Sequence, residues 1–360
     1  DFNGERRGSR LKKNLYGKSN MIDLSICIPT YNRVKYLKNC LNSILIACEN
    51  SGLKIEVCIS DNCSDEDTYS TVKEFEDKIN IVFNQNAFNI GLGNNILKSV
   101  SIAKGEFAWI LGNDDLVLPN SFKIIEKLIK NNLDVNFYYI NSFHLNKNII
   151  DKFDTPLDTR KIDFTKLKRF SNYKKSKKQE FFELINPLKS FEFMLSMYLC
   201  IFKKKYWVEN VNVIDKKNIS DATLYSNFDN TAPHIKIWSA AFNNKISYFL
   251  HEPLSANIHG PRDEDWGDLY AFVEAVRIPE VLDCYRNNGM SFLRFFICKN
   301  YALRRFLPGF YKMILKPKHK GLEYVKIWRH VIKNSLYPGV YIFGFYFFFR
   351  RLFIIVKNLF

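Results

Sequence analysis

Between residues 22 and 145 the chain alternates short apolar runs with longer segments whose apolar residues recur at helical spacing. The runs that predict strands are 24–28, 55–60, 79–83, 107–111 and 135–140. Strands that alternate with helices in this way predict an α/β fold with a mainly parallel sheet and right-handed crossovers. Because the carboxyl ends of parallel strands meet at one edge of a sheet, the residues after each strand indicate what this edge can bind.

Polar residues follow three of the predicted strands. Pro29-Thr30-Tyr31-Asn32-Arg33 follows the first strand, Asp61 the second, and Gly112-Asn113-Asp114-Asp115 the fourth. Two adjacent carboxylates beyond a strand end are candidate ligands for a hard divalent cation and its attached phosphates. The alternative for Gly-Asn-Asp is an ordinary solvated turn. The glycine-containing loop at 84–93 lacks both GxGxxG and GK[ST], which argues against a dinucleotide fold and a P-loop.

The charge of the chain implies an anionic partner. The sequence has 53 Lys and Arg against 37 Asp and Glu, a net charge of +16. Nucleic acid, an acidic membrane surface and phosphorylated ligands all fit such a charge. We expect no nucleic-acid partner, because the sequence has no zinc-finger, helix-turn-helix or RNA-recognition signature. The eight cysteines form no CxxC pair, which predicts free thiols in a reduced cytosolic protein and no zinc site.

Four motifs, taken in order, resemble the family-2 glycosyltransferases with the GT-A fold. They are Ser25-Ile26-Cys27-Ile28-Pro29-Thr30-Tyr31-Asn32-Arg33, Ile59-Ser60-Asp61-Asn62-Cys63-Ser64-Asp65, Asn89-Ile90-Gly91-Leu92-Gly93-Asn94-Asn95 and Gly112-Asn113-Asp114-Asp115. The last motif is similar to the abequosyltransferase-like branch of bacterial O-antigen and surface-polysaccharide enzymes. The resemblance covers residues 22–145 strongly and continues weakly to 262. It implies a Rossmann-like, mainly parallel sheet flanked by helices, and transfer of a sugar from a nucleoside diphosphate-sugar with Mg²⁺ or Mn²⁺.

The resemblance also implies a donor site. The nucleotide would contact Pro29, Thr30, Tyr31, Asn32, Arg33, Asp61, Asn89, Gly91, Asn95, Asn113 and Asp114. Within this set, Asp61 would accept hydrogen bonds from the base. Asp114 and Asp115 would hold the metal, His259 would complete the metal shell, and Arg262 would pair with phosphate. Two positions depart from the family pattern, since Gly112 stands where an Asp is common and Asn94 where an Arg is common.

We expect the catalytic base to lie C-terminal to the basic segment 151–180. A base must deprotonate the acceptor hydroxyl while the cation stabilises the departing phosphate. Asp229 and His234 compete for this role, because the family's usual Glu-Asp pair is missing from residues 221–235. A helix cap or a buried hydrogen-bonding group is the alternative for each.

The remaining segments give the expected domain organisation. Residues 1–20 form a flexible basic arm, 21–262 the GT-A domain, and 263–360 a helical, aromatic and basic region. Within the GT-A domain, 151–180 is expected to be a mobile basic insertion, with contact to membrane phosphates as a second possibility. Within the segment 339–360 the uninterrupted apolar run is too short for a span of about 20 residues, and Arg350-Arg351 would lie near the bilayer centre. These features favour an interfacial helix or a re-entrant anchor. A dimerisation or core-packing helix is the alternative.

These expectations describe a peripheral enzyme at the cytoplasmic face of the inner membrane. It would transfer a sugar from a nucleoside diphosphate-sugar, with UDP the most expected nucleotide, to a saccharide on a lipid carrier by a single inverting displacement. The alternatives are a noncatalytic membrane scaffold with a transferase fold, a nucleotidyltransferase and a nucleic-acid-binding protein. Release of pyrophosphate would identify the second, and salt-sensitive DNA binding without nucleotide-sugar binding the third.

Overall fold

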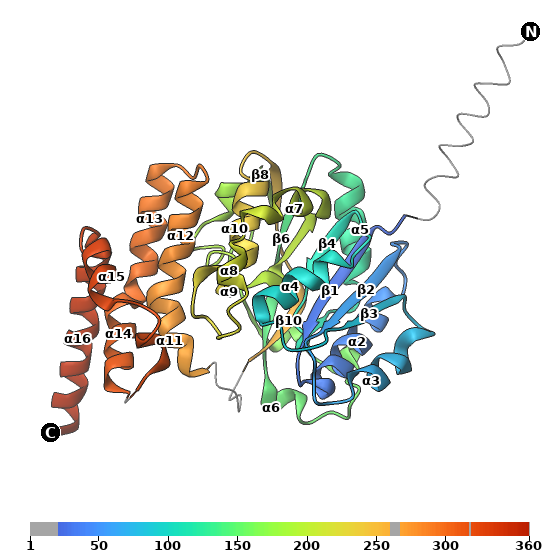
Figure 1. The fold of residues 1–360 in the computed structure, drawn as a ribbon, viewed down its shortest axis with the longest axis horizontal. Helices are drawn as coiled ribbons and strands as arrows, with labels where there is room; N and C mark the ends of the chain where they lie inside the picture. Colours follow the sequence, from blue (N-terminus) through green and yellow to red (C-terminus); the bar gives the residue numbers. More distant parts are fainter. Residues whose placement is uncertain (1–20, 260–266, 317, 360) are drawn as a thin grey trace, which may run out of the picture.

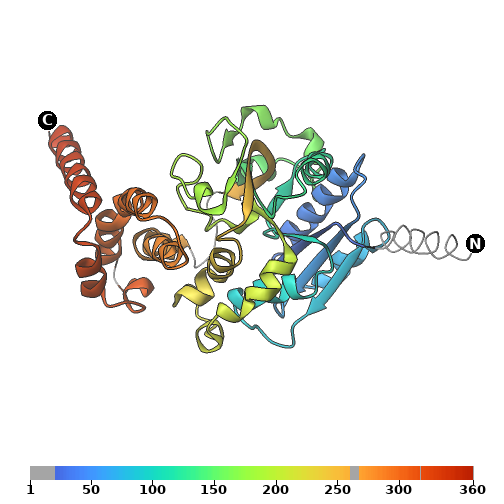
Figure 2. The same ribbon diagram turned by 90° about the horizontal axis from the view of Figure 1, so that it is seen from above.

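The computed structural model describes residues 21–259, 267–316 and 318–359. The expected basic arm and Arg262 lie outside these residues. An α/β body is built on one ten-stranded sheet, and a helical region that begins at Gly267 lies to one side of it (Figures 1 and 2). The expected GT-A-like body and C-terminal helical extension are therefore both present.

The strands form a single mixed sheet in the order β3-β2-β1-β4-β9-β6-β10-β5, with β7 paired to β6 and β8 paired to β10. Their bounds are β1 (Leu24–Thr30), β2 (Ile55–Asp61), β3 (Ile81–Gln85), β4 (Phe107–Ile110), β5 (Asp115–Val117), β6 (Phe137–Asn146), β7 (Lys168–Arg169), β8 (Lys177–Glu180), β9 (Cys200–Lys203) and β10 (Ile246–His259). The half from β3 to β4 is parallel, as expected. The strand β9 then runs antiparallel between β4 and β6, although β6 and β10 are again parallel.

Helices lie on both faces of this sheet. The α-helices of the body are α2 (Val34–Cys48), α3 (Thr68–Glu76), α4 (Leu92–Ser101), α5 (Ser121–Asn131), α6 (Lys147–Ile150), α7 (Lys204–Asn210), α8 (Lys216–Ile219), α9 (Phe228–Thr231) and α10 (Pro233–Ala241). The described helices of the C-terminal region are η6 (Gly267–Leu269), α11 (Tyr270–Phe272), the π-helix η7 (Val273–Arg277), α12 (Ile278–Asn287), α13 (Phe292–Ala302), η8 (Leu303–Arg305), α14 (Phe306–Leu315), η9 (Lys320–Leu322), α15 (Ile327–Asn334) and α16 (Pro338–Leu359).

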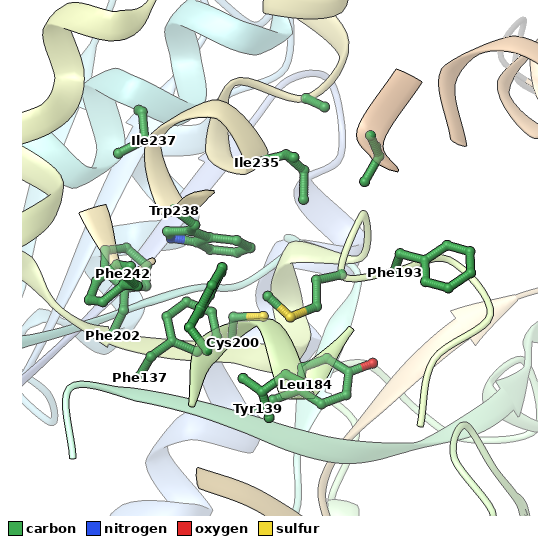
Figure 3. Close-up of a cluster of buried hydrophobic side chains, with 14 of the residues drawn as sticks. Phe137, Tyr139, Leu184, Phe193, Cys200, Phe202, Ile235, Ile237, Trp238 and Phe242 are labelled. Atoms are coloured by element: carbon green, nitrogen blue, oxygen red, sulfur yellow. The ribbon is translucent and has the colours of Figure 1, made fainter. Parts of the chain in front are cut away.

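The strands alternate between two buried clusters, which explains why their sequences are continuously apolar. In β1, Ile26 and Ile28 belong to a cluster with α2, α3 and α5, whereas Cys27 belongs to a second cluster with α4, α7 and α10. The second cluster is rich in aromatic rings, and Figure 3 shows Phe137, Phe202, Trp238 and Phe242 packed together. The ring centroids of Phe137 and Trp238 are 5.3 Å apart. This cluster joins the sheet to the chain after residue 180, so the second half of the body shares its core with the first.

The segment 151–180 is packed against the body, which differs from the mobile insertion that the sequence suggested. Leu157 and Ile162 are buried with residues of β5, β6 and β10. The segment also supplies β7 and β8, which pair with β6 and β10. The apolar residues of this segment are separated by lysines. The run of charge therefore suggested a mobile loop, although the apolar residues anchor the segment to the body.

The eight cysteines are free thiols, as expected. No helix among the described residues is long and apolar enough to cross a membrane.

Candidate functional site

A pocket of about 650 Å³ lies beyond the end of β4, between the sheet and the helical region. The α/β body contributes the acidic turn after β4, the segment 191–198, and parts of α4, α10 and β10. The helical region contributes the opposite side through Tyr270, Val273, Glu274 and Ile278. Two segments that are distant in the sequence thus meet around one cavity.

The predicted acidic pair lines this pocket, and Gly112 explains its geometry. The Asp115 Oδ2 accepts a hydrogen bond from the Gly112 backbone N–H at 2.9 Å. A Cβ atom on Gly112 would lie 2.7 Å from Asp115 Oδ2 and 2.8 Å from Asp114 Oδ1. A side chain at this position would therefore displace both carboxylates. The departure of Gly112 from the family pattern is compatible with an acidic site, because both carboxylates fold back over the glycine.

Asp115 also begins a row of polar residues that crosses three strands. Asn257 of β10 pairs in register with Asp115 of β5 on one side and with His144 of β6 on the other. The Asn257 amide donates to Asp115 Oδ1 at 2.7 Å. The His144 ring lies edge-on to the His259 ring at 5.2 Å, and burial together with His259 lowers the pKa of His144 to about 4. All four side chains line the pocket, and neither Asn257 nor His144 was identified from the sequence.

The predicted nucleotide edge lies beside this pocket and is held by a network of buried amides. Asn113 donates to Thr30 Oγ1 at 2.8 Å, which ties the end of β4 to the end of β1. The Asn95 amide donates to the backbone carbonyls of Thr30 and Ser60 and accepts from the Ser60 hydroxyl and the Asn86 amide. Asn95 is thus a fully paired structural group that positions β1 and β2.

Asp61 is buried at the end of β2, where its carboxylate accepts from the Ser64 hydroxyl at 2.5 Å and from the Gln85 amide at 3.2 Å. The loop after β3 is held in the same way. Asn89 Oδ1 accepts from the Asn62 amide at 2.7 Å and from the Gly91 backbone N–H at 2.9 Å. These contacts hold the ends of β2 and β3 in place, where the nucleotide base is predicted to bind.

The residues just after β1 are more accessible. Pro29 is buried within β1, whereas Tyr31 is 42% exposed. Asn32 has a positive φ of 49°, and its side chain pairs with Asp65 across the neighbouring strand end. Arg33 reaches the acidic pair, and its Nη1 lies 3.1 Å from Asp114 Oδ2. Arg33 therefore connects the nucleotide edge to the pocket.

The two predicted candidates for the catalytic base lie in different places. His234 lines the pocket, but its Nε2 is 3.0 Å from the Leu195 carbonyl, and burial lowers its pKa to about 4. The Asp229 carboxylate does not line the pocket. It is held by Lys236 at 2.6 Å and by the backbone N–H of Asp215 at 3.1 Å. Asp229 therefore lies in α9, where its carboxylate pairs with Lys236 of α10.

The sequence did not single out Glu192 or Glu274, which both line the pocket. Glu192 accepts a hydrogen bond from the Ser196 hydroxyl. Burial, with a smaller contribution from the Glu274 carboxylate, raises the pKa of Glu192 to about 7. Glu274 comes from the π-helix η7, and its Oε1 lies 3.6 Å from Arg305 Nε. The sequence does carry a signal for both residues, since each is an acid within an apolar, aromatic segment, which is an unusual place for a carboxylate.

Among the described residues, no cluster of three or more His, Cys, Asp or Glu side chains could hold a metal ion by itself. The two adjacent carboxylates nevertheless match the chemistry of Mg²⁺, which keeps several waters and takes one or two carboxylates together with substrate phosphates. The residues present thus fit a cation that arrives with a diphosphate.

Residues 25–193 match the family model described as Glycosyl transferase family 2. Abequosyltransferase RfbV of Salmonella typhimurium is 40% identical over 114 residues, which is 31% of this chain and 34% of that protein. The GalNAc(5)-diNAcBac-PP-undecaprenol beta-1,3-glucosyltransferase of Campylobacter jejuni is 32% identical over 109 residues, which is 29% of this chain and 34% of that protein. The chain thus matches about a third of the length of these two relatives.

A crystal structure of Staphylococcus aureus TarS 1–349 in complex with UDP-GlcNAc has a similar fold. The TM-score is 0.53 at 16% identity, and the match covers 86% of this chain and 77% of that chain. This likeness confirms the expected GT-A fold. Residues 25–193 thus match the expected glycosyl transferase family 2 domain, in a body that has the GT-A fold.

Proposed function

We propose that this protein transfers a glycosyl group from a nucleoside diphosphate-sugar to a saccharide carried on a lipid. One observation carries the proposal: the acidic pair Asp114-Asp115 and the carboxyl group of Glu192 line the same pocket. Glycosyl transfer needs both kinds of group, since one must stabilise the departing diphosphate and the other must take the proton of the acceptor hydroxyl.

The donor nucleotide lies along the ends of β1 and β2 in this proposal, with its diphosphate directed toward Asp114. Tyr31 offers an accessible ring at this edge, and Arg33 offers a cation beside the acidic pair. A planar guanidinium suits phosphate oxygens, so Arg33 can contact the diphosphate as well as Asp114. A solved protein of this fold was crystallised with UDP-GlcNAc, which supports a nucleotide sugar as the donor and UDP as the first nucleotide to test.

Asp114 and Asp115 would hold Mg²⁺ or Mn²⁺ together with the donor diphosphate, whereas His259 lines the same pocket but forms no three-residue metal cluster with them in the described part of the chain. When bound, the cation neutralises the negative charge that develops on the leaving diphosphate. The hydrogen bonds from Gly112 and Asn257 orient the Asp115 carboxylate in advance. Such support is typical of metal ligands, whose outer hydrogen bonds determine their orientation. Arg262, which was expected to contact phosphate, lies outside the described residues.

Glu192 is the proposed general base, in place of Asp229 and His234. A carboxyl group with a pKa of about 7 is partly ionised at neutral pH and can accept a proton from a sugar hydroxyl. His234, with a pKa of about 4, is a weaker base, and Asp229 is held by Lys236 away from the pocket. Attack of the deprotonated hydroxyl on the anomeric carbon, from the face opposite the diphosphate, would invert the configuration of the sugar.

A lipid-linked acceptor is supported by the name of the Campylobacter relative, which includes a saccharide attached to PP-undecaprenol. In the proposal the acceptor saccharide enters the side of the pocket formed by Tyr270 and Glu274. The protein would then act in bacterial surface glycan synthesis as a peripheral enzyme at the cytoplasmic face of the membrane.

The test is a turnover assay with a panel of nucleotide sugars and lipid-linked saccharides, with and without Mn²⁺. We expect release of nucleoside diphosphate that depends on the metal. We also expect NMR to show a product of inverted anomeric configuration. Release of pyrophosphate would identify a nucleotidyltransferase. Donor binding in the absence of any turnover, including hydrolysis, across the whole panel would favour a noncatalytic scaffold.

A further inference from the structure

The last helix, α16, exposes an apolar stripe where a helix in water would carry polar residues. Ile342, Phe345, Phe349, Leu352 and Phe353 are between 59% and 76% exposed. At 100° per residue these five positions fall on one side of the helix. The opposite side packs on the protein through Val340, which is buried, and Gly344, which lies against Leu307 of α14. Figure 2 shows the C-terminal end of α16 at the outer edge of the helical region.

Cations flank this stripe. Between residues 303 and 360 the sequence has twelve Lys and Arg residues and a single acidic residue, Glu323. Arg350 is exposed on α16 beside the stripe. Arg351 folds back onto α14, where its Nη1 donates to the Tyr311 hydroxyl at 2.6 Å and its guanidinium lies 4.6 Å from the Tyr311 ring. The charge of Arg351 is thereby kept off the apolar stripe.

The charge decides which partner covers the stripe. A second copy of this chain would bring another strongly basic surface against the first, and like charges that face one another are unfavourable. An anionic phospholipid surface attracts the cations and accepts the apolar side chains at the boundary of headgroups and acyl chains. We propose that the exposed stripe of α16 and its flanking cations form a docking surface for a bilayer that contains anionic phospholipid.

Packing connects this surface to the pocket. Helix α14 lies against both η7 and α16. A Cβ atom on Gly309 of α14 would lie 2.7 Å from Ala275 Cβ in η7, one residue after Glu274. Gly344 gives α16 a comparably close approach to α14, because a Cβ at this position would clash with Leu307 Cδ1. Docking of α16 therefore holds the Glu274 side of the pocket at a defined place relative to the lipid surface. This connection to a lipid-linked acceptor rests on the proposed function.

The test is co-sedimentation of the full chain with vesicles of phosphatidylcholine alone or mixed with phosphatidylglycerol, without donor or acceptor. We expect binding to the mixed vesicles that weakens as salt increases. The triple variant Phe345→Ser/Phe349→Ser/Leu352→Ser should lower the partition coefficient at least about 100-fold, because three apolar side chains are lost. Leu133→Ser removes an exposed apolar residue from the body and is the matched control.

The variant Arg350→Gln/Lys357→Gln should lower binding about 25-fold, since each of the two cations near an anionic surface contributes about fivefold. Lys123→Gln/Lys127→Gln on α5 is its control. Equal binding to both vesicle compositions, or equal binding by wild type and the triple variant, would overturn the proposal. A dimer that the triple variant abolishes, without any vesicle binding, would assign the stripe to a second copy. Transfer to a soluble saccharide without vesicle binding would refute docking and leave the proposed function standing.

Discussion

The nucleotide edge and the opposite side of the pocket are built in contrasting ways. At the edge, neutral amides and hydroxyls are paired with one another, as in the contacts of Asn95 with Ser60 and Thr30. Across the pocket, Glu192 and His234 lie among aromatic and aliphatic side chains, and Glu274 lies near Arg305. Paired dipoles give a rigid surface that suits the proposed nucleotide without a change in charge, whereas burial raises the pKa of Glu192 into a range suited to proton transfer.

The largest effect is expected where the two regions meet. Asp115→Ala should lower kcat about 10⁴-fold, because a cation on a developing phosphate charge is worth several kcal/mol. Steady-state kinetics at saturating donor and Mn²⁺ measures this. Asn257→Ala removes one hydrogen-bond donor to Asp115 while the carboxylate stays, so its loss of activity should be much smaller. Equal losses in the two variants would mean that the carboxylate has only a structural role.

Glu192→Gln tests the opposite side of the pocket. The amide cannot take a proton, so kcat should fall about 10³-fold while donor affinity is unchanged. In wild type, kcat should rise as the pH passes about 7, the pKa to which burial raises Glu192, and this rise should be absent from the variant. A pH–rate profile of both proteins checks the prediction. Glu183→Gln, which changes an acid outside the pocket lining, is the control, and an unchanged profile in Glu192→Gln would return the role to another residue.

Asn95→Ala should affect stability and donor binding more than chemistry. Its amide serves buried groups on β1 and β2, and the variant leaves several of them unpaired, at a cost of about 2 to 3 kcal/mol in the free energy of unfolding. Urea titration measures this loss. Asn80→Ala, at an exposed position before β3, should change stability by less than about 0.5 kcal/mol. Similar stabilities for the two variants would contradict the view of the edge as a preorganised network.

The smallest effect concerns how the Glu192 carboxyl group changes the free energy of unfolding with pH. The folded pKa of Glu192, about 7, lies above the ordinary value of 4.5, so the folded state binds the proton more tightly. This contribution to stability is present below pH 4.5 and is lost as the pH rises through 7. Glu192→Gln lacks that loss, so its stability relative to wild type should increase by about 2 kcal/mol between pH 4.5 and pH 8, a shift reduced by the partial exposure of the side chain. Urea titrations across this range test the sign, and a constant difference would contradict it.

The two regions also differ in how well the sequence predicted them. The strands from β1 to β4 and the residues at their ends are contiguous motifs, so Thr30, Asp61, Asp114 and Asp115 were placed at one edge from spacing alone. The pocket's opposite side depends on β9 entering the sheet between β4 and β6 and on η7 packing against the body. Such contacts connect residues that are far apart in the chain, and no local pattern reports them. Glu192 and Glu274 were missed for that reason.

Asp229 and the segment 151–180 show a second limit of the sequence. An acid at the start of a helix suggests a base as readily as it suggests a structural group, and the contact of Asp229 with Lys236 favours the structural group. Lysines at 174–178 suggested a mobile loop, although strand pairing through β8 anchors this segment. Asp229 pairs with Lys236 of the next helix, and the lysines of β8 lie in a strand that pairs with β10. Both contacts join residues of different segments.

The ends of β1, β2 and β4 form the metal-dependent donor site that we propose. The most direct test is calorimetric titration of nucleoside diphosphates and nucleotide sugars, beginning with UDP, into wild type and into Asp114→Ala/Asp115→Ala, each with and without Mn²⁺. We predict that wild type binds one nucleotide far more tightly with Mn²⁺ and that the folded double variant loses this dependence. Equal binding by both proteins, or no binding of any nucleotide to folded wild type, would contradict the assignment of the donor site.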